Sequence, residues 1–345
     1  MKALVTGATG FIGGNLTREL LEEGFQVRAL VRRESDKRNI EGLDIEMATG
    51  DLLDVASLKD ALEGCEVLFH CAALYTLWAR DRQALYSTNV GGTRNILKAA
   101  LEKGVKRVVY TSTASTIGLS KGGVPSTEEV EPSPQDLIGH YKRSKYIAEL
   151  EALKLCRAGL PLVVVNPTAP VGPGDVKPTP TGQIILDFLK GKMPAYLDTG
   201  LNLIHVKDVA RGHILALEKG RVGERYILGN TNMSFKAILD TLAEITGRSS
   251  PRIRVPYLVA LGFAYVDELS GTILGRSPRA PITGVRMAKK PMYFDATKAV
   301  RELGLPQTPV REALKEAVDW FYEQERVKKG AAASTSQDEL VKAKV

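Results

Sequence analysis

A tyrosine and a lysine four residues apart are the side chains of this 345-residue sequence best suited to moving a proton. Tyr141 and Lys145 fall within the stretch 140–157, whose pattern predicts a helix, and residues four apart on a helix share one face. A phenol titrates at about pH 10 unaided, and an ammonium group a few ångströms away stabilises the phenolate and lowers its pKa. We therefore interpret the pair as a general acid/base and its activator.

A run of hydroxyl side chains follows the predicted strand 107–111, about 30 residues before the tyrosine. A hydroxyl at Ser112, Thr113 or Ser115 could hydrogen-bond a substrate oxygen and orient it for Tyr141. Spacing alone leaves the choice among the three open. A tyrosine and a lysine at this spacing often form an ordinary surface pair, so the functional interpretation depends on the neighbouring hydroxyls and on a dinucleotide-binding turn.

Three glycines form that turn after the first predicted strand, 2–6. Gly7 permits a tight turn, Gly10 lets the backbone approach a pyrophosphate, and Gly13 lets the predicted helix 11–23 lie close to the strand. The helix N-terminus supplies N–H donors and the positive end of a dipole. A strand before the turn and an amphipathic helix after it distinguish this motif from an incidental glycine-rich turn. The expected cofactor contacts here are Gly7, Thr9, Gly10, Phe11, Ile12 and Gly13.

The end of the second predicted strand, 26–31, indicates which nucleotide binds. NAD-binding proteins usually carry a carboxylate there for the ribose 2′-hydroxyl, whereas this sequence has Arg32 and Arg33 and no carboxylate before Glu34. Guanidinium groups favour a 2′-phosphate. We therefore expect NADP(H), with NAD(H) as the alternative if the arginines are only solvated surface residues. Tyr141 and Lys145 would then also contact the cofactor, the lysine through the nicotinamide ribose hydroxyls.

Two further strand ends complete the expected cofactor site. After the third predicted strand, the Asp51 carboxylate can hydrogen-bond the adenine amino group. Small residues after the fourth predicted strand let the backbone pass close to the cofactor, so we interpret Cys71 as a packing residue rather than a nucleophile. The contacts expected at these two strand ends are Asp51, Leu52, Cys71, Ala72 and Ala73.

Alternating strands and helices before residue 170 predict an α/β fold, a Rossmann-type doubly wound parallel sheet. The predicted strands are 2–6, 26–31, 44–47, 67–70, 107–111 and 162–166, and the predicted helices are 11–23, 55–62, 82–103 and 140–157. The proline-rich segment 167–181 is expected to hold neither a helix nor a central strand.

After this segment we expect a smaller, mostly helical substrate domain. Its predicted helices are 182–190, 207–218, 235–246, 257–270 and 311–326. The expected division is a dinucleotide-binding domain over 1–170, which some later segments rejoin, a substrate-binding domain over 171–327 and a disordered tail over 328–345. The strongly apolar stretch 255–266 reads most simply as a core helix, with a hydrophobic substrate or a membrane surface as the alternative.

Composition narrows the classes of partner. The net charge is +7, but the basic residues form no stripe of the kind that binds nucleic acid, so we expect an anionic cofactor or substrate and no nucleic acid. The three cysteines are widely spaced and form no CxxC pair, which argues against disulfides and a metal site and favours the cytoplasm. No apolar run approaches the length of a membrane span, and no secretory signal is visible.

The substrate pocket is expected beyond the carboxyl ends of the strands, under the second half of the chain. The candidates are Tyr75 and Trp78 in the stretch 74–78, His140 beside the acid/base, and the segment 177–181. Tyr75 and Trp78 could equally be packing residues. His205 fits no metal or nucleophile pattern and is expected to support the fold.

Together these motifs resemble the extended short-chain dehydrogenase/reductase family over about residues 1–325. The stretches that carry the resemblance are TGATGFIG (6–13), GDL (50–52), HCAA (70–73), TST (111–113), YKRSK (141–145) and NPTAPVGP (166–173). The resemblance implies a catalytic hydroxyl, an acid/base, its activator and a structural and relay asparagine at Thr113, Tyr141, Lys145 and Asn89, respectively. It also implies a loop over the nicotinamide amide, formed by Asn166, Pro167 and Thr168.

Within this family the sequence is most similar to dihydroflavonol 4-reductase-like proteins, especially the bacterial subgroup labelled hopanoid-associated sugar epimerases. The closer likeness lies in GHYKRSK (139–145), KPTPTG (177–182), MPAYLDTGLNLIHV (193–206) and GERYILG (223–229). Arg32 departs from the acidic residue typical of nucleotide-sugar epimerases. The helices 82–103 and 140–157 resemble the family's dimer face, which implies a homodimer.

Three functions remain to be compared. The leading one is reduction of a small-molecule carbonyl by hydride transfer, with Tyr141 as proton donor. The alternative is epimerisation or dehydration of a sugar linked to hopanoid biosynthesis, and Arg32 favours reduction over it. A non-catalytic nucleotide-binding regulator would be expected to lack the tyrosine or the lysine, and both are present.

Overall fold

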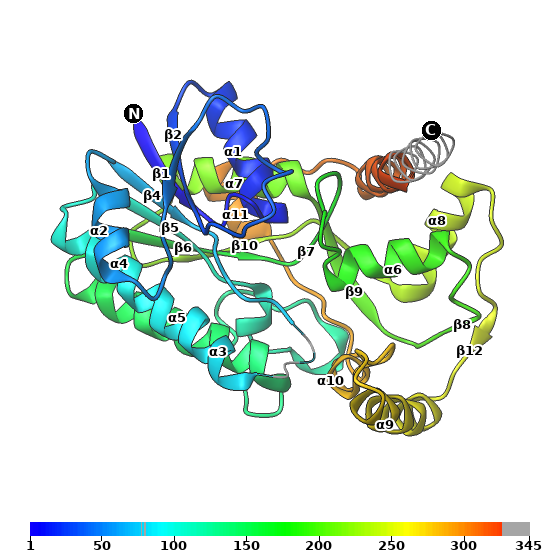
Figure 1. Ribbon diagram of the computed structural model, residues 1–345. Coiled ribbons are helices and arrows are strands. Elements are labelled where there is room, and N and C mark those ends of the chain that lie inside the picture. The colour runs from blue at the N-terminus through cyan, green and yellow to red at the C-terminus, as the bar shows by residue number, and fades with distance from the viewer. Residues whose placement is uncertain (77, 79–80, 326–345) are drawn as a thin grey trace, which may run out of the picture.

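Seven parallel strands form the central sheet of the computed structural model, which describes residues 1–76, 78 and 81–325 (Figure 1). The strand order is β10-β6-β5-β4-β1-β2-β3, and in register Leu4 of β1 lies between Arg28 of β2 and Leu68 of β4. The strands are β1 (Lys2–Thr6), β2 (Gln26–Val31), β3 (Glu46–Thr49), β4 (Val67–His70), β5 (Arg107–Thr111), β6 (Leu162–Pro167) and β10 (Arg225–Leu228). The predicted doubly wound parallel sheet is confirmed.

Helices cover both faces of this sheet. Successive residues of β1 point to opposite sides: Ala3 and Val5 pack in the core under one set of helices and Leu4 in the core under the other. The first set comprises α1 (Phe11–Glu22), α7 (Val206–Lys219) and α11 (Thr297–Leu303). The second comprises α2 (Val55–Leu62), α4 (Thr93–Glu102) and α5 (Gly139–Arg157). Burial on both faces explains why the strands read as continuous apolar runs.

The second half adds helices and two small sheets. β7 (Ala169–Val171), β9 (Gly200–His205) and β11 (Thr231–Ser234) form one sheet, and β8 (Ala195–Tyr196) pairs with β12 (Ile253–Arg254). The helices of this half are α6 (Pro180–Leu189), α8 (Phe235–Thr246), α9 (Tyr257–Ile273), α10 (Ile282–Met287) and a helix over 310–325. Phe188 of α6, Leu239 of α8 and Leu314 of the last helix belong to one core that joins these three helices.

The helix expected over 82–103 is interrupted near its middle. α3 (Arg82–Tyr86) is followed by a π-helical turn, Ser87–Gly92, before α4 begins. A Cβ on Gly92 would lie 2.7 Å from Cβ of Leu52, so glycine is needed where the turn passes the loop after β3. π-helical turns are frequent at functional sites. The third strand also differs slightly, because it begins at Glu46 rather than at residue 44.

The expectation that 167–181 holds neither a helix nor a central strand is wrong at both ends of the segment. Pro167 is the last residue of the central strand β6, where a missing N–H is tolerated because the next residue, Thr168, donates to the carbonyl of Leu228 instead. Pro180 is the first residue of α6, where no intrahelical donor is required, and the Thr179 hydroxyl caps that helix.

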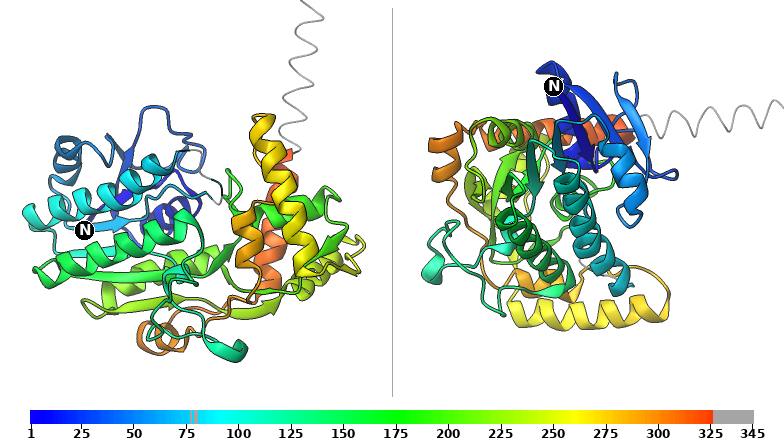
Figure 2. Two further views of the ribbon diagram at one scale, coloured as in Figure 1. Left: turned by 90° about the horizontal axis from the view of Figure 1, so that it is seen from below. Right: turned by 90° about the vertical axis from the view of Figure 1, so that its left-hand side faces the viewer.

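The core-helix interpretation of 255–266 is also wrong. α9 lies at the outer edge of the second half (Figures 1 and 2), and its buried residues are Ala264, Asp267 and Gly271, while its large apolar side chains face outward. Among the described residues no helix is long and apolar enough to cross a membrane. The expected tail, 328–345, lies outside the described residues, and the division at residue 170 stays a prediction.

Candidate active site

The glycine turn contacts the loop after β4 so closely that side chains are excluded. Gly7 has φ +75°, in the left-handed region, and a Cβ there would lie 2.7 Å from the backbone nitrogen of Ala72. A Cβ on Gly13 would collide with the carbonyl oxygen of Gly7. Gly10 is exposed and caps α1, which has no side-chain cap and no acidic residue in its first turn. The N-terminal amides of α1 are therefore available to an anion such as a pyrophosphate.

Two buried asparagines, which the sequence analysis missed, hold this turn in place. Asn39 donates from Nδ2 to the carbonyls of Thr9 (3.2 Å) and Gly174 (3.0 Å). Asn15, in the first turns of α1, donates to the carbonyl of Pro173 (3.1 Å). The bonds to Gly174 and Pro173 tie the turn to the loop after β7, more than 130 residues away, so no local pattern could have revealed them.

Arg32 and Arg33 lie exposed at the end of β2. Within the described part of the chain neither guanidinium has a hydrogen bond or an ion pair. The nearby carboxylate of Asp36 is instead paired with Arg38, whose hydrogen bonds lower the pKa of Asp36 to about 2. The residues present therefore fit a phosphate at this strand end.

The other two predicted sets of cofactor contacts follow β3 and β4. Asp51 uses one carboxylate oxygen to accept from the backbone N–H of Leu53 (2.8 Å). The Thr111 hydroxyl donates to Sγ of Cys71 (3.1 Å), and burial raises the pKa of that thiol to about 11. A thiol with so high a pKa is a poor nucleophile, which suits the packing role expected for Cys71.

Lys145 joins α5 to the end of β5. Its Nζ donates to the hydroxyl of Tyr110 (3.1 Å) and to the carbonyl of Thr111 (2.8 Å), which leaves one N–H for another acceptor. Burial lowers the pKa of Lys145 to about 8. The side chain thus remains largely charged at neutral pH, in a position fixed by the strand.

Tyr141 differs from the expectation in its ionisation. Its ring lies against Tyr75, with 4.3 Å between centroids, and burial together with the neighbouring phenols of Tyr75 and Tyr110 raises its pKa well above the usual value. Lys145 does not lower this pKa, because its ammonium group is bound to Tyr110 and Thr111 instead. Tyr141 is therefore a neutral phenol, able to donate a proton.

Thr113 is held with its hydroxyl partly exposed, whereas Ser112 is buried. The Thr113 hydroxyl accepts from the backbone N–H of Ser115 (3.2 Å), so its own proton is free to be donated. Its carbonyl accepts from the amide of Asn166 (3.1 Å) and the backbone N–H of Thr116 (3.1 Å). Of the three candidate hydroxyls, the geometry makes Thr113 better suited than Ser112 to a substrate oxygen.

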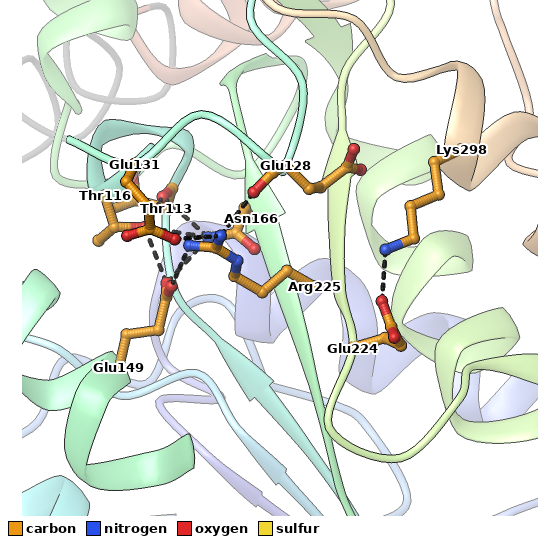
Figure 3. A network of polar contacts seen from close by, with 9 residues as sticks. All are labelled: Thr113, Thr116, Glu128, Glu131, Glu149, Asn166, Glu224, Arg225 and Lys298. Carbon is orange, nitrogen blue, oxygen red and sulfur yellow. Dashed lines mark hydrogen bonds and ion pairs between the residues drawn. The ribbon is translucent and has the colours of Figure 1, made fainter. Parts of the chain in front are cut away.

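A buried polar network holds the turn 113–116 in place (Figure 3). The Glu149 carboxylate accepts from Thr116 (2.7 Å), Asn166 (2.9 Å) and Arg225 (3.4 Å), and it links α5 to β6 and β10. The side chain of Asn166 is fully buried in this network, so only its backbone is left for the loop over a nicotinamide that the resemblance implied, and that loop stays a prediction. The sequence analysis missed Glu149, although its position four residues after Lys145 placed a charge on the same helix face.

Asn89 joins the loop after β4 to α5. Its Nδ2 donates to the carbonyl of Leu74 (3.0 Å) and to Oγ of Ser144 (3.0 Å), while its Oδ1 accepts from the N–H of Leu74 (2.7 Å). Ser144 in turn donates to the carbonyl of Tyr141 (2.8 Å). Asn89 therefore positions Tyr75 and Tyr141 relative to each other.

The expected substrate residues are dispersed around the site. Tyr75 contacts Tyr141, whereas Nδ1 of His140 lies 3.3 Å from the hydroxyl of Tyr86 and faces away toward α3. Trp78 lines a cavity of about 480 Å³ between the loop after β4 and the segment after α9. The residues lining it are Leu74, Thr76, Trp78, Asp81, Ala84, Gly275 and Ser277.

The remaining predicted positions are at the ends of β6 and β9. Pro167 and Thr168 lie at the carboxyl end of β6, and the Thr168 hydroxyl donates to the carbonyl of Leu228 (3.3 Å). His205 caps α7 by accepting from the N–H of Lys207 (3.0 Å), which is the supporting role expected for it.

Similar proteins place this arrangement in a known family. Residues 3–229 match the NAD dependent epimerase/dehydratase family. A protein of Synechocystis sp. provisionally named dihydroflavonol 4-reductase is 52% identical, over 92% of this chain and 93% of its own length. Sterol demethylase protein B of Methylococcus capsulatus is 39% identical, over 94% of this chain and 99% of its own length. The crystal structure of gox2253 superimposes with a TM-score of 0.84 at 46% identity, over 94% of this chain and 98% of the other.

The family match spans more than half of the chain and includes the glycine turn, the tyrosine–lysine pair and the returning strand β10. Such proteins are enzymes that use a nicotinamide cofactor, and the free helix terminus and unpaired arginines described above fit that cofactor. The chain belongs to the NAD dependent epimerase/dehydratase family of extended short-chain dehydrogenases/reductases.

Proposed function

We propose that this protein is an NADP(H)-dependent reductase that converts a carbonyl group to an alcohol, with Tyr141 as proton donor. The observation that carries the proposal is the pair of exposed, unpartnered guanidinium groups of Arg32 and Arg33 at the end of β2. A 2′-phosphate would supply the missing partner, and a carboxylate suited to NAD is absent from that strand end.

The residues that would hold the cofactor are shared among three strand ends. The amides at the start of α1 would bind the pyrophosphate, Arg32 the 2′-phosphate and Asp51 the adenine. Lys145 has one N–H left for a ribose hydroxyl. When bound, NADPH supplies a hydride to the carbonyl carbon.

The protein's own side chains complete the reduction at the carbonyl oxygen. Thr113 donates a hydrogen bond that polarises the C=O, and Tyr141 donates the phenolic proton that turns the oxygen into a hydroxyl. The phenolate left on Tyr141 takes a proton from solvent before the next turnover. A raised pKa of Tyr141 suits this direction, because the enzyme starts the cycle with the proton in place.

The names of the relatives support reduction and suggest a hydrophobic ring compound as substrate. One is named for a dihydroflavonol and one for a sterol. A substrate of this class would occupy the cavity lined by Trp78, whose aromatic surface suits a ring, and would reach from there toward Tyr75 and Tyr141. A homodimer through α4 and α5 and a cytoplasmic location stay predictions.

The test is a nucleotide titration. Protein freed of nucleotide is titrated with NADPH and NADH, alongside Arg32→Ala and the control Arg38→Ala, whose arginine is already paired. Loss of a charge-assisted contact worth about 1.5–3 kcal/mol predicts roughly 10- to 150-fold weaker NADPH binding for Arg32→Ala, with NADH binding unchanged. Equal affinities for both nucleotides, or stoichiometric NAD⁺ carried through purification, would overturn the proposal and favour sugar epimerisation.

A further inference from the structure

α9 lies at the outer edge of the second half (Figures 1 and 2), and it exposes large apolar side chains along its whole length. Each of them is between 58% and 77% exposed, and from Val259 onward their spacing of three and four residues places them on one side of the helix, with Leu258 beside them. This α9 outer face consists of Leu258, Val259, Phe263, Val266, Leu269 and Ile273. A helix of 17 residues is about 25 Å long, so the face is far larger than a scattered surface leucine.

The two acidic residues that interrupt the apolar sequence do not interrupt this face. Asp267 is buried and accepts from the backbone N–H of Ala280 (2.9 Å) and the guanidinium of Arg276 (2.7 Å). Glu268 accepts from the backbone N–H of Ile282 (2.9 Å). Both carboxylates thus turn inward to hold the segment after α9, which leaves the α9 outer face without negative charge.

Basic residues outnumber acidic ones in α9 and the segments that flank it. The segment 252–290 contains seven lysines and arginines against only the two inward-facing acids. Arg254 is paired with Asp198 (3.2 Å) and Lys290 lies 3.4 Å from Asp136. In the described part of the chain Arg252 and Arg279 are exposed and have no acidic partner. An apolar helix face flanked by cations is complementary to the anionic surface of a lipid bilayer.

The same surface adjoins a cavity beside the loop that carries Tyr75. Gly275 and Ser277, directly after α9, line the cavity together with Trp78. Thr283 of α10 packs against Gly139, where a Cβ would lie 2.5 Å from the threonine methyl group, two residues before Tyr141. A surface bound by the α9 outer face would therefore lie next to the cavity opening.

We propose that the α9 outer face docks the protein on an anionic membrane surface and that the cavity takes its substrate from that bilayer. The second clause rests on the proposed function, whereas the first does not. A second copy of the chain would bring a matching set of cations against this one, so like charges disfavour it as the occupant.

The test is flotation of the full chain with lipid vesicles, made of phosphatidylcholine alone or with about a third phosphatidylglycerol. Wild type should bind the anionic vesicles at least about tenfold better, and salt should weaken the binding. The variant Phe263→Ser/Val266→Ser/Ile273→Ser should lose vesicle binding at least about tenfold. The control Leu53→Ser/Val124→Ser/Val222→Ser, which alters three equally exposed apolar residues elsewhere, should bind as wild type does.

NADPH titration and sedimentation of the same variants separate the outcomes. The α9 variant should keep wild-type NADPH affinity, which would show that it is folded. If wild type itself fails to bind NADPH, the proposed function is refuted, whereas the docking proposal is unaffected. Vesicle binding that is absent in wild type, or unchanged in the α9 variant, would overturn the docking proposal. If wild type is an oligomer and the α9 variant is a monomer, the docking proposal is also overturned, because the α9 outer face would then be an interface between copies of the chain.

Discussion

Glu149→Ala removes the acceptor on which two buried donors and one half-buried guanidinium converge. The carboxylate is 2% exposed and accepts from Thr116, Asn166 and Arg225, so the substitution leaves the guanidinium with only the exposed Glu131 as counter-charge. Removing one partner of a buried ion pair costs about 3–5 kcal/mol. Because a domain is stable by only about 5–15 kcal/mol, the variant should be severely destabilised.

Urea unfolding measures this loss, and a double variant checks its cause. Glu149→Leu/Arg225→Met removes both charges and should be more stable than Glu149→Ala, since no unpaired charge remains. A destabilisation below about 1 kcal/mol for Glu149→Ala, or a double variant at least as unstable as the single one, would refute the reasoning.

Glu149 also acts on Lys145, the proposed partner of Tyr141, which gives a second readout in Glu149→Gln. The negative charge of Glu149 raises the pKa of Lys145 against the effect of burial. Its neutral replacement should therefore move the alkaline loss of activity to lower pH. A purely structural role would lower activity at every pH and leave the profile in place.

Tyr141→Phe should lower kcat about 10²–10⁴-fold, the usual contribution of a general acid. A titration should show that its affinity for NADPH is nearly unchanged. Surviving turnover would show that another group supplies the proton. The pKa of Lys145 falls from its usual 10.5 to about 8 on folding, so the unfolded chain binds more protons between these pH values, and this group makes the free energy of unfolding rise as pH increases from about 8 to 10.5. Urea unfolding should show a smaller rise in Lys145→Met. An equal rise would contradict the assignment. Activity that needs the Lys145 charge should instead fall above about pH 8, as a pH–rate profile would show. Gly13→Ala should abolish NADPH binding, because its methyl group collides with the Gly7 carbonyl, and wild-type affinity would show that the turn is looser than described.

The sequence by itself determined the parallel sheet, its flanking helices and the glycine turn. These features follow from patterns a few residues long: continuous apolar strands, helical periodicity and glycines where a side chain is excluded. Gly7 has the positive φ expected of a tight turn, and Tyr141 and Lys145 lie on one helix. Short-range geometry suffices for such conclusions because the bonds involved close within one or two turns of chain.

Only the tertiary structure decided how the side chains of the site are paired. Lys145 contacts residues 34 and 35 positions away, and the pKa of Tyr141 is raised by burial and by the phenols of Tyr75 and Tyr110. Glu149 and Arg225 meet because β10 returns to the sheet beside β6. α9 faces outward because its two carboxylates bind the backbone that follows it. These pairings depend on which helix packs on which strand, and the free energy of that packing is shared by residues far apart in the chain, beyond the reach of any local pattern.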